Sequence, residues 1–244
     1  MYRFVLIILL LTITLEANNS YFHKKELRIL PLGKLELNNQ LFNGQLIYLL
    51  PSKKLYLIQY EAGNQNGEIV IWYKSGVCYL RGFTKENQYH NTNTEYYIDG
   101  KIKLYEQFKN GKENGVVAYF NKKGNLQRQA NYKNGIETEI LFDKEKGINS
   151  PKAFSKEQLL ESIPQSKFHH KKELEFRDGK FYLKEELYIG CIINFEKGVL
   201  SIREVLNGVL HGSFKSWSAD GKVLSMTKYK NGKKVLKKEK DEKK

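Results

Sequence analysis

The sequence predicts an all-β protein made of tandem antiparallel β-hairpins, arranged as single-sheet arrays, with one short helix between two arrays. Three observations support this fold class. Glycines recur at fixed spacings, an aromatic residue lies three or four positions before many of them, and apolar residues follow at even offsets. Aromatic residues make up 13% of the 244 residues, which suits packed hairpins and argues against a disordered basic chain.

The glycine spacing is the first of these observations. Five glycines are each followed by a second glycine eleven residues later, and the second often belongs to an Asn-Gly pair. Asp-Gly pairs predict tight turns, because Asp and Gly tolerate positive φ; these are at Asp99-Gly100, Asp178-Gly179 and Asp220-Gly221. The eleven-residue pairs are Gly33/Gly44, Gly100/Gly111, Gly124/Gly135, Gly179/Gly190 and Gly221/Gly232.

Apolar residues follow the turn glycines at offsets of +2 and +8. Both offsets are even, so on a regular strand the two residues face the same side. We therefore expect a half-buried antiparallel sheet with one apolar face and one polar face. The +2 residues are Leu35, Ile102, Leu126, Phe181, Leu200 and Val223, and the +8 residues are Leu41, Phe108, Tyr132, Leu187, Leu206 and Tyr229.

These units resemble the MORN-variant repeat of the YwqK-type antitoxin family over roughly residues 44–147 and 176–232. The clearest matches run from Tyr96 to Gly100 and from Phe108 to Gly115, then over 119–135 and 217–232. The stretch 84–94 departs from the pattern because it lacks the Asn-Gly step, and Lys53-Lys54 occupy a turn-glycine position. The resemblance implies a repeat architecture, and it implies an antitoxin or immunity role as one functional alternative.

A longer internal repetition divides the chain. Residues 22–27 recur as residues 169–174 at an offset of 147, Gly33 corresponds to Gly179 at 146, and Trp72 corresponds to Trp217 at 145. Small loop deletions explain the drift in offset. The sequence therefore predicts a first hairpin array over 21–147 and a second over 168–232.

The remaining segments complete the predicted organisation. Residues 148–167 form a linker with a short helix, which starts at Ser155 as N-cap with Gln158 at the third helical position and ends before Pro164. We expect this helix to cap the end of the first array, although a mobile linker is the alternative. Residues 233–244 form a lysine-rich tail that we expect to be solvated.

The first 17 residues have the three-part form of a secretory signal peptide. A short basic lead precedes an apolar run over 4–15, which is too short for a comfortable membrane span, and Ala17 provides a cleavage position. We therefore expect an exported protein of the periplasm or cell envelope of a bacterium. An uncleaved N-terminal anchor is the alternative.

No catalytic, cofactor-binding or metal-binding residues are predicted, and the binding residues are left undetermined. The histidines have no zinc spacing, and His211 near Ser213 is interpreted as a hairpin position instead of a catalytic pair. Cys78 and Cys191 occupy different repeat positions, which argues against a disulfide without deciding the matter. The five histidines are His23, His90, His169, His170 and His211.

Charge gives the only indication of a partner. Lysine and arginine total 41 against 27 acidic residues, for a net charge of +14, which attracts anionic lipid, lipopolysaccharide or acidic protein. Export argues against nucleic acid. The sequence is therefore interpreted as an exported, non-enzymatic protein-binding or scaffolding module in the cell envelope. The alternatives are a YwqK-type antitoxin or immunity protein and a binder of anionic membrane surface.

Overall fold

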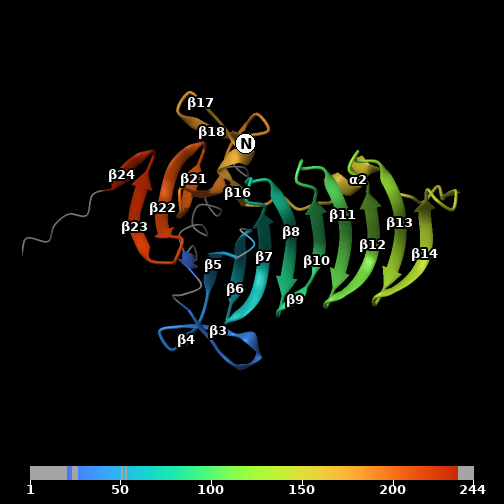
Figure 1. Cartoon of the computed structure of the whole chain (residues 1–244), viewed down its shortest axis with the longest axis horizontal. Helices are drawn as coiled ribbons and strands as arrows, with labels where there is room; N and C mark the ends of the chain where they lie inside the picture. The colour runs from blue at the N-terminus through green and yellow to red at the C-terminus, as the bar shows by residue number, and fades with distance from the viewer. Residues whose placement is uncertain (1–20, 24–26, 51, 53, 236–244) are drawn as a thin grey trace, which may run out of the picture. The chain divides into compact units, whose positions relative to one another are not determined.

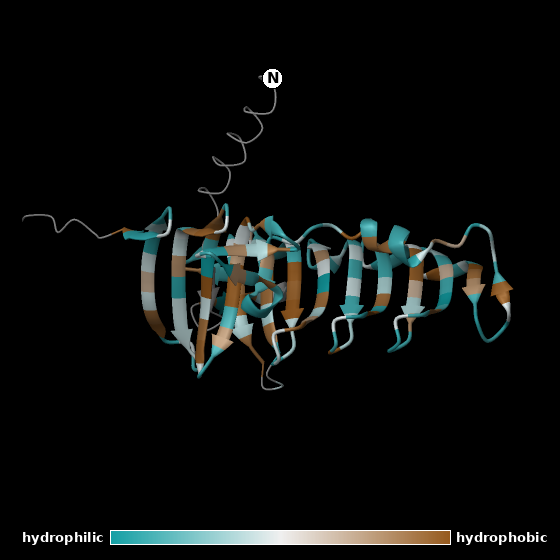
Figure 2. Cartoon of the chain, turned by 90° about the horizontal axis from the view of Figure 1, so that it is seen from above, coloured by the Kyte–Doolittle hydropathy of each residue, from teal (hydrophilic) through white to brown (hydrophobic). Residues whose placement is uncertain are grey.

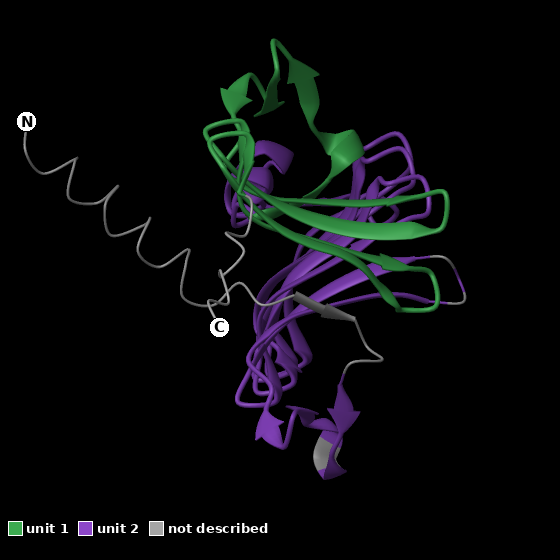
Figure 3. Cartoon of the chain, turned by 90° about the vertical axis from the view of Figure 1, so that its left-hand side faces the viewer, with its two compact units in different colours: residues 1–19, 167–244 green, residues 20–166 purple. Residues whose placement is uncertain are grey.

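A computed structural model describes residues 21–23, 27–50, 52 and 54–235, and the predicted signal peptide over 1–17 lies outside them. The chain divides into two compact units (Figure 3): unit 2 spans residues 20–166, and unit 1 comprises residues 167–244 with residues 1–19. The predicted all-β class is confirmed. Among the described residues, α2 (Lys156–Glu161) is the only α-helix.

Unit 2 is built on a 12-stranded sheet and a separate three-stranded sheet. Apart from its first strand, the large sheet is antiparallel, and consecutive strands are mostly neighbours (Figure 1). Its strands are β1 (Tyr21–His23), β5 (Gly44–Leu49), β6 (Leu55–Glu61), β7 (Asn64–Trp72), β8 (Cys78–Lys85), β9 (Gln88–Tyr89), β10 (Asn91–Tyr96), β11 (Ile102–Lys109), β12 (Lys112–Phe120), β13 (Leu126–Lys133), β14 (Ile136–Asp143) and β15 (Ile148–Asn149). The small sheet contains β2 (Arg28–Ile29), β3 (Leu35–Leu37) and β4 (Gln40–Leu41), with the 3-10 turn η2 (Pro31–Gly33) between β2 and β3.

Unit 1 repeats this plan at a smaller size, with a six-stranded and a three-stranded sheet. The large sheet contains β16 (Phe168–His170), β20 (Gly190–Glu196), β21 (Val199–Leu206), β22 (Val209–Ser218), β23 (Val223–Lys230) and β24 (Lys233–Val235). The small sheet contains β17 (Glu175–Arg177), β18 (Lys180–Leu183) and β19 (Glu186–Leu187), preceded by the 3-10 turn η3 (Lys171–Glu173). Because β24 pairs with β23, the first three residues of the predicted solvated tail are an edge strand.

The two units open in the same way. In unit 2, β1 pairs in parallel with β5, and in unit 1, β16 pairs in parallel with β20. The small sheets are tied to the large ones by corresponding backbone hydrogen bonds. Leu35 N donates to Gly63 O at 2.8 Å, and Phe181 N donates to Gly208 O at 2.8 Å. The structure therefore has the internal correspondence that the sequence offsets predicted.

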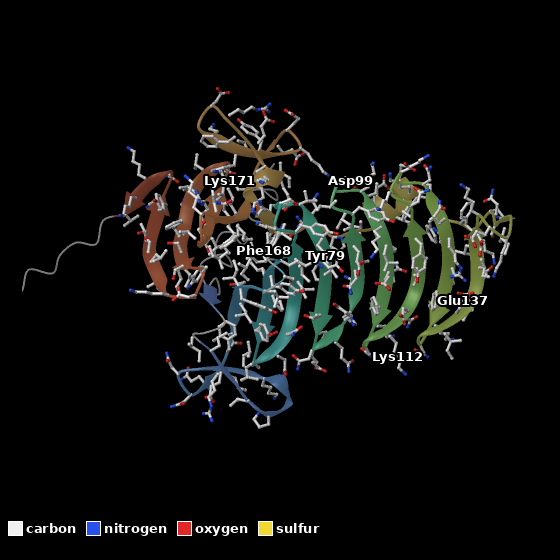
Figure 4. The ribbon with its side chains drawn as sticks, in the orientation of Figure 1. Tyr79, Asp99, Lys112, Glu137, Phe168 and Lys171 are labelled. Carbon is white, nitrogen blue, oxygen red and sulfur yellow. The ribbon has the colours of Figure 1, made fainter. Side chains whose placement is uncertain are left out.

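Two kinds of turn connect the strands of the large sheets. Tight two-residue turns have positive φ at both residues, as at Asn110-Gly111, and wider turns lie at the other strand ends. Figure 4 shows the two positions: Asp99 lies in a wide turn, and Lys112 follows a tight turn at the opposite end of the strands. The two-residue turns include Ala62-Gly63, Glu86-Asn87, Asn110-Gly111, Asn134-Gly135, Lys197-Gly198, Asn207-Gly208 and Asn231-Gly232.

The predicted role of the Asp-Gly pairs is therefore correct only at Asp178-Gly179, where both residues have positive φ. Asp99-Gly100 lies in a wider turn that is closed by Tyr97 N donating to Lys101 O at 2.8 Å, and only its glycine has positive φ. Asp220-Gly221 lies in a turn of the same kind. In the stretch 84–94, Glu86-Asn87 adopts the tight turn that Asn-Gly forms elsewhere.

The expectation that the +2 and +8 residues share one face is wrong in the long hairpins. The pairing register shifts immediately after each wide turn, for example where Tyr96 pairs with Ile102 but Glu95 pairs with Leu104. This inserts one bulged residue, Lys103, so Ile102 and Phe108 lie on opposite faces. The corresponding shifts are between Ile71 and Trp72, Tyr119 and Phe120, and Ser216 and Trp217.

A second bulge lies at the glycine that comes four residues after a tight turn. At Gly67, a Cβ atom would stand 2.3 Å from Oε1 of Gln59, which accepts a hydrogen bond from Glu68 N at 2.6 Å. Gln107 with Gly115 and Glu204 with Gly212 repeat this arrangement. The side chain of one strand thus occupies the space above the glycine of the next, which explains why glycine stands there.

Helix α2 starts as predicted, with Ser155 and Gln158 forming a reciprocal capping box. Its position differs from the prediction. Leu159 is buried against a face of the sheet, so α2 covers β11 and β12. The strand at the end of the array is β15. The first residues of the predicted linker therefore belong to the sheet. The cluster around Leu159 contains Ile102, Tyr105, Val116, Ala118 and Phe120.

The core nearest the small sheet corresponds between the units. In Figure 2, hydrophobic and hydrophilic bands alternate along the strands, as expected for residues on opposite faces. In unit 2 the cluster contains Leu35, Phe42, Leu46, Ile58, Tyr60, Ile69, Ile71 and Leu80. In unit 1 it contains only Tyr188, Ile192 and Val205, with partly buried Leu174, Phe181, Leu183 and Leu210 around them.

Candidate binding groove

The smaller core of unit 1 reflects a change of chemistry on one face of its sheet. Strand registers match between β20–β23 of unit 1 and β5–β8 of unit 2, so each of these paired positions in unit 1 has a counterpart in unit 2. Ile58 pairs with Leu46 and Ile69, whereas its counterpart Arg203 pairs with Ile192 and Phe214. A charged side chain therefore stands where unit 2 has a buried isoleucine.

The neighbouring row changes in the same direction. In unit 2, Tyr48 and Tyr56 stack with ring centres 5.2 Å apart. Their counterparts are Asn194 and Ser201, which also pair directly across β20 and β21. The row continues across β22 and β23 through Ser216 and Ser225, where unit 2 has Ile71 and Leu80.

This polar face contains a shallow groove of about 420 Å³. Three strands of unit 1 position its side chains, since β20, β21 and β22 are neighbours in the sheet, and Figure 1 shows β21 beside β22. Ser201 and Ser216 are buried at its floor, with 5% of each residue exposed. The groove is lined by Asn194, Glu196, Lys197, Val199, Ser201, Arg203, Phe214 and Ser216.

Arg203 is the charged centre of the groove. Its guanidinium carbon lies 5.6 Å from the centre of the Phe214 ring, which is within cation–π range. Its Nε atom is buried and has no hydrogen-bond partner among the described residues. Burial lowers the pKa of Arg203, while Tyr229 acts in the opposite direction. Arginine stays charged under such conditions, so a half-buried cation remains without a paired anion among the described residues.

Unit 2 has a different polar feature farther along the equivalent face. Burial raises the pKa of Glu106 to about 7, with further contributions from Glu113 and Glu95, while Lys103 opposes the shift. Glu106 pairs across the strands with Asn93, whose Oδ1 is buried and finds no hydrogen-bond partner in the part of the chain that the structure describes. This region holds one acid that is readily protonated near neutral pH.

Three of the five histidines considered from the sequence lie in structural roles. Nδ1 of His169 lies 3.1 Å from the hydroxyl of Tyr188, and His170 caps the turn η3. Burial lowers the pKa of His170 to about 4, with Lys172 and Lys171 contributing. His211 contacts Asn231, with 3.2 Å between Nδ1 and Oδ1, and Ser213 N donates to Glu204.

The structure also bears on the cysteines, on metal binding and on membrane-spanning helices. Cys78 is buried in β8 of unit 2, and Cys191 is buried in β20 of unit 1. In the described part of the chain, no group of three or more His, Cys, Asp or Glu side chains is arranged to hold a metal ion. Within the same residues, no helix has the length and apolar character needed to cross a membrane.

The groove residues were not predicted from the sequence. The internal offset of 145 contained the signal, because an alignment of the two arrays matches Arg203 with Ile58 and Ser216 with Ile71. No known family profile matches the chain, and a search of the curated proteins finds no similar sequence.

Proposed function

We propose that this chain is a non-enzymatic binding module that docks another protein through the polar face of unit 1, and that it works outside the cytoplasm in the bacterial envelope. The observation that carries the proposal is Arg203, a half-buried cation without a paired anion among the described residues, in a groove where the corresponding position of unit 2 is apolar. Partial burial of an unpaired charge destabilises a fold, so a site that retains one is a candidate for recognition.

The side chains around the groove favour binding over catalysis. Serine hydroxyls, an amide and a guanidinium supply hydrogen bonds, and Phe214 supplies apolar contact. The groove lining contains no histidine that could act as the general base for one of its serines. Aromatic residues and arginine, here Phe214 and Arg203, are enriched in protein interfaces.

Site-specific photo-crosslinking in the source organism tests this proposal. A photoreactive residue at Ser225 stands on the polar face, and one at Met226 stands on the opposite face of the same strand. We expect a discrete crosslinked protein from Ser225 that is absent from Met226. The same bands from both positions, or none from Ser225, would contradict docking on this face.

A second candidate function rests on the lysines at the edge of unit 1. Lys228, Lys230, Lys233 and Lys234 are exposed on β23 and β24. An exposed row of lysines attracts anionic lipid or lipopolysaccharide. Binding to phosphatidylglycerol vesicles at low salt, lost when these four lysines are changed to glutamine, supports this function. Equal retention of the variant contradicts it.

A further inference from the structure

The arginines of this protein differ in how their charge is compensated. Arg28 lies 3.3 Å from Glu36, Arg128 lies near Glu137 and Asp143, and Arg177 lies near Glu175 and Glu185. Arg203 has no ion pair among the described residues, although it is more buried than Arg128 and Arg177. Its charge is therefore available for a ligand.

The guanidinium of Arg203 restricts what the groove can bind. Its carbon lies 5.6 Å from the centre of the Phe214 ring and its Nε is buried, so its terminal N–H groups are the donors that a ligand can meet. These N–H groups form a planar fork that matches a carboxylate in a bidentate arrangement. Ser201 and Ser216 lie on the same face of the sheet, in the next row, and their hydroxyls can donate to an oxyanion.

Charge selects among oxyanions. Glu196 and Lys197 also line the groove, so with Arg203 the groove carries a net single positive charge. A monoanion neutralises this charge, whereas a phosphate dianion would leave the groove with a net negative charge. The small floor residues Asn194, Ser201 and Ser216 leave room for a short side chain.

We propose that the groove of unit 1 is a carboxylate-binding site in which Arg203 anchors an aspartate or glutamate side chain of the partner protein. This inference rests on the proposed docking function and names the chemistry of the contact. The counterpart Ile58 shows that the same fold accepts an apolar residue at this position. Arg203 therefore contributes recognition at the cost of stability, as binding residues often do.

The test is an NMR titration of the full chain at constant ionic strength and neutral pH. The probe is acetyl-aspartyl-amide, its neutral isostere acetyl-asparaginyl-amide is the control ligand, and inorganic phosphate is the comparison. The signals followed are the Nε–H of Arg203 and the backbone amides of Ser201 and Ser216. We expect saturable shifts with the aspartyl compound and none with the asparaginyl compound.

Three variants decide the role of Arg203. Arg203→Ile introduces the residue of the counterpart position, so we expect a folded and more heat-resistant protein whose Ser201 and Ser216 amides bind the probe roughly tenfold more weakly or worse. Arg203→Lys keeps the charge without the fork and should give an intermediate affinity. Arg128→Leu removes an arginine that is already paired and should leave the titration unchanged.

The outcomes separate clearly. Unchanged Ser201 and Ser216 shifts in Arg203→Ile, or equal shifts with both amino-acid amides, would overturn the site. Tighter binding of phosphate would overturn the carboxylate assignment. Carboxylate binding without a crosslinked partner from Ser225 would retain the site and refute protein docking, so the two proposals fail in different ways.

Discussion

The two units share strand registers, but the side chains on one equivalent face are apolar in unit 2 and mostly polar in unit 1. In unit 2 the face beside the small sheet is filled by Leu46, Ile58, Ile69, Ile71 and Leu80, whereas unit 1 keeps the registers and replaces most of these side chains with polar ones. Turn glycines, bulge glycines and the parallel opening strand are shared. A few positions therefore maintain the backbone geometry, and the side chains on this face can change without altering it.

The largest expected effect tests the shared geometry. Gly67→Ala would place a Cβ atom 2.3 Å from Oε1 of Gln59 at a φ of +119°, and we expect a loss of about 3 kcal/mol in the free energy of unfolding. Gly147→Ala is the control in the same unit, since it has positive φ but nothing within 4 Å, and should cost about 1 kcal/mol. Urea denaturation measures both.

Unit 1 provides the matching pair. Gly212→Ala meets Glu204 in the same way, whereas Gly198→Ala meets nothing within 4 Å. If Gly212→Ala were tolerated while Gly67→Ala was not, the bulges of the two units would not be equivalent, and a shared backbone geometry would be refuted.

The next effect concerns a position where the cores differ by one hydroxyl. Tyr188 is the counterpart of Phe42, and its hydroxyl lies 2.9 Å from Lys167 O and 3.0 Å from Cys191 O. Tyr188→Phe should lower the free energy of unfolding by about 1–2 kcal/mol, because the hydrogen bond that this buried hydroxyl donates to a backbone carbonyl is lost. Phe42→Tyr is the reciprocal change and should also destabilise. A neutral Tyr188→Phe in thermal denaturation would show that the hydroxyl is dispensable.

A smaller effect concerns the acid of unit 2. Burial raises the pKa of Glu106 from 4.5 to about 7. The contribution of the protonated carboxyl to the free energy of unfolding is therefore fully present below pH 4.5 and is lost as the pH rises through about 7. Glu106→Gln should therefore raise the free energy of unfolding at pH 8 by about 1 kcal/mol after solvent screening, with no gain at pH 4.

Urea denaturation at the two pH values checks this sign. Glu139→Gln is the control, because Lys152 and Asn131 lower the pKa of Glu139, so its loss should destabilise at pH 8 if it has any effect. The same gain for Glu106→Gln at both pH values would show that burial of the charge is not the cause.

The sequence predicted the fold better than the site because turns are local and faces are not. The tight turn at Asp178-Gly179 and the capping box of Ser155 with Gln158 each depend on nearby residues, and both were predicted correctly. The faces of Ile102 and Phe108 were predicted incorrectly, because the bulge between them adds one residue and reverses the alternation. Turn glycines give no signal for such a bulge.

The groove could not be predicted for a related reason. Arg203 is one of 41 basic residues, and only the pairing with Phe214 and the absence of a facing carboxylate distinguish it. Arg128 looks similar in sequence but faces Glu137 in space. The position of α2 could not be predicted from the sequence either. An apolar face indicates that a helix packs on other elements, but it does not indicate which strands it contacts.

The parallel opening strands impose an order on folding. Each later strand pairs mainly with its immediate predecessor, so a chain that folds from its N-terminus can add strands almost as soon as they emerge. β1 is different, because its partner β5 begins some twenty residues later and the three-stranded sheet lies between them in the sequence. In such a chain we expect β1 to wait for β5 and the sheet to grow from that delayed pair toward β15. The same delay is expected at β16, which pairs in parallel with β20.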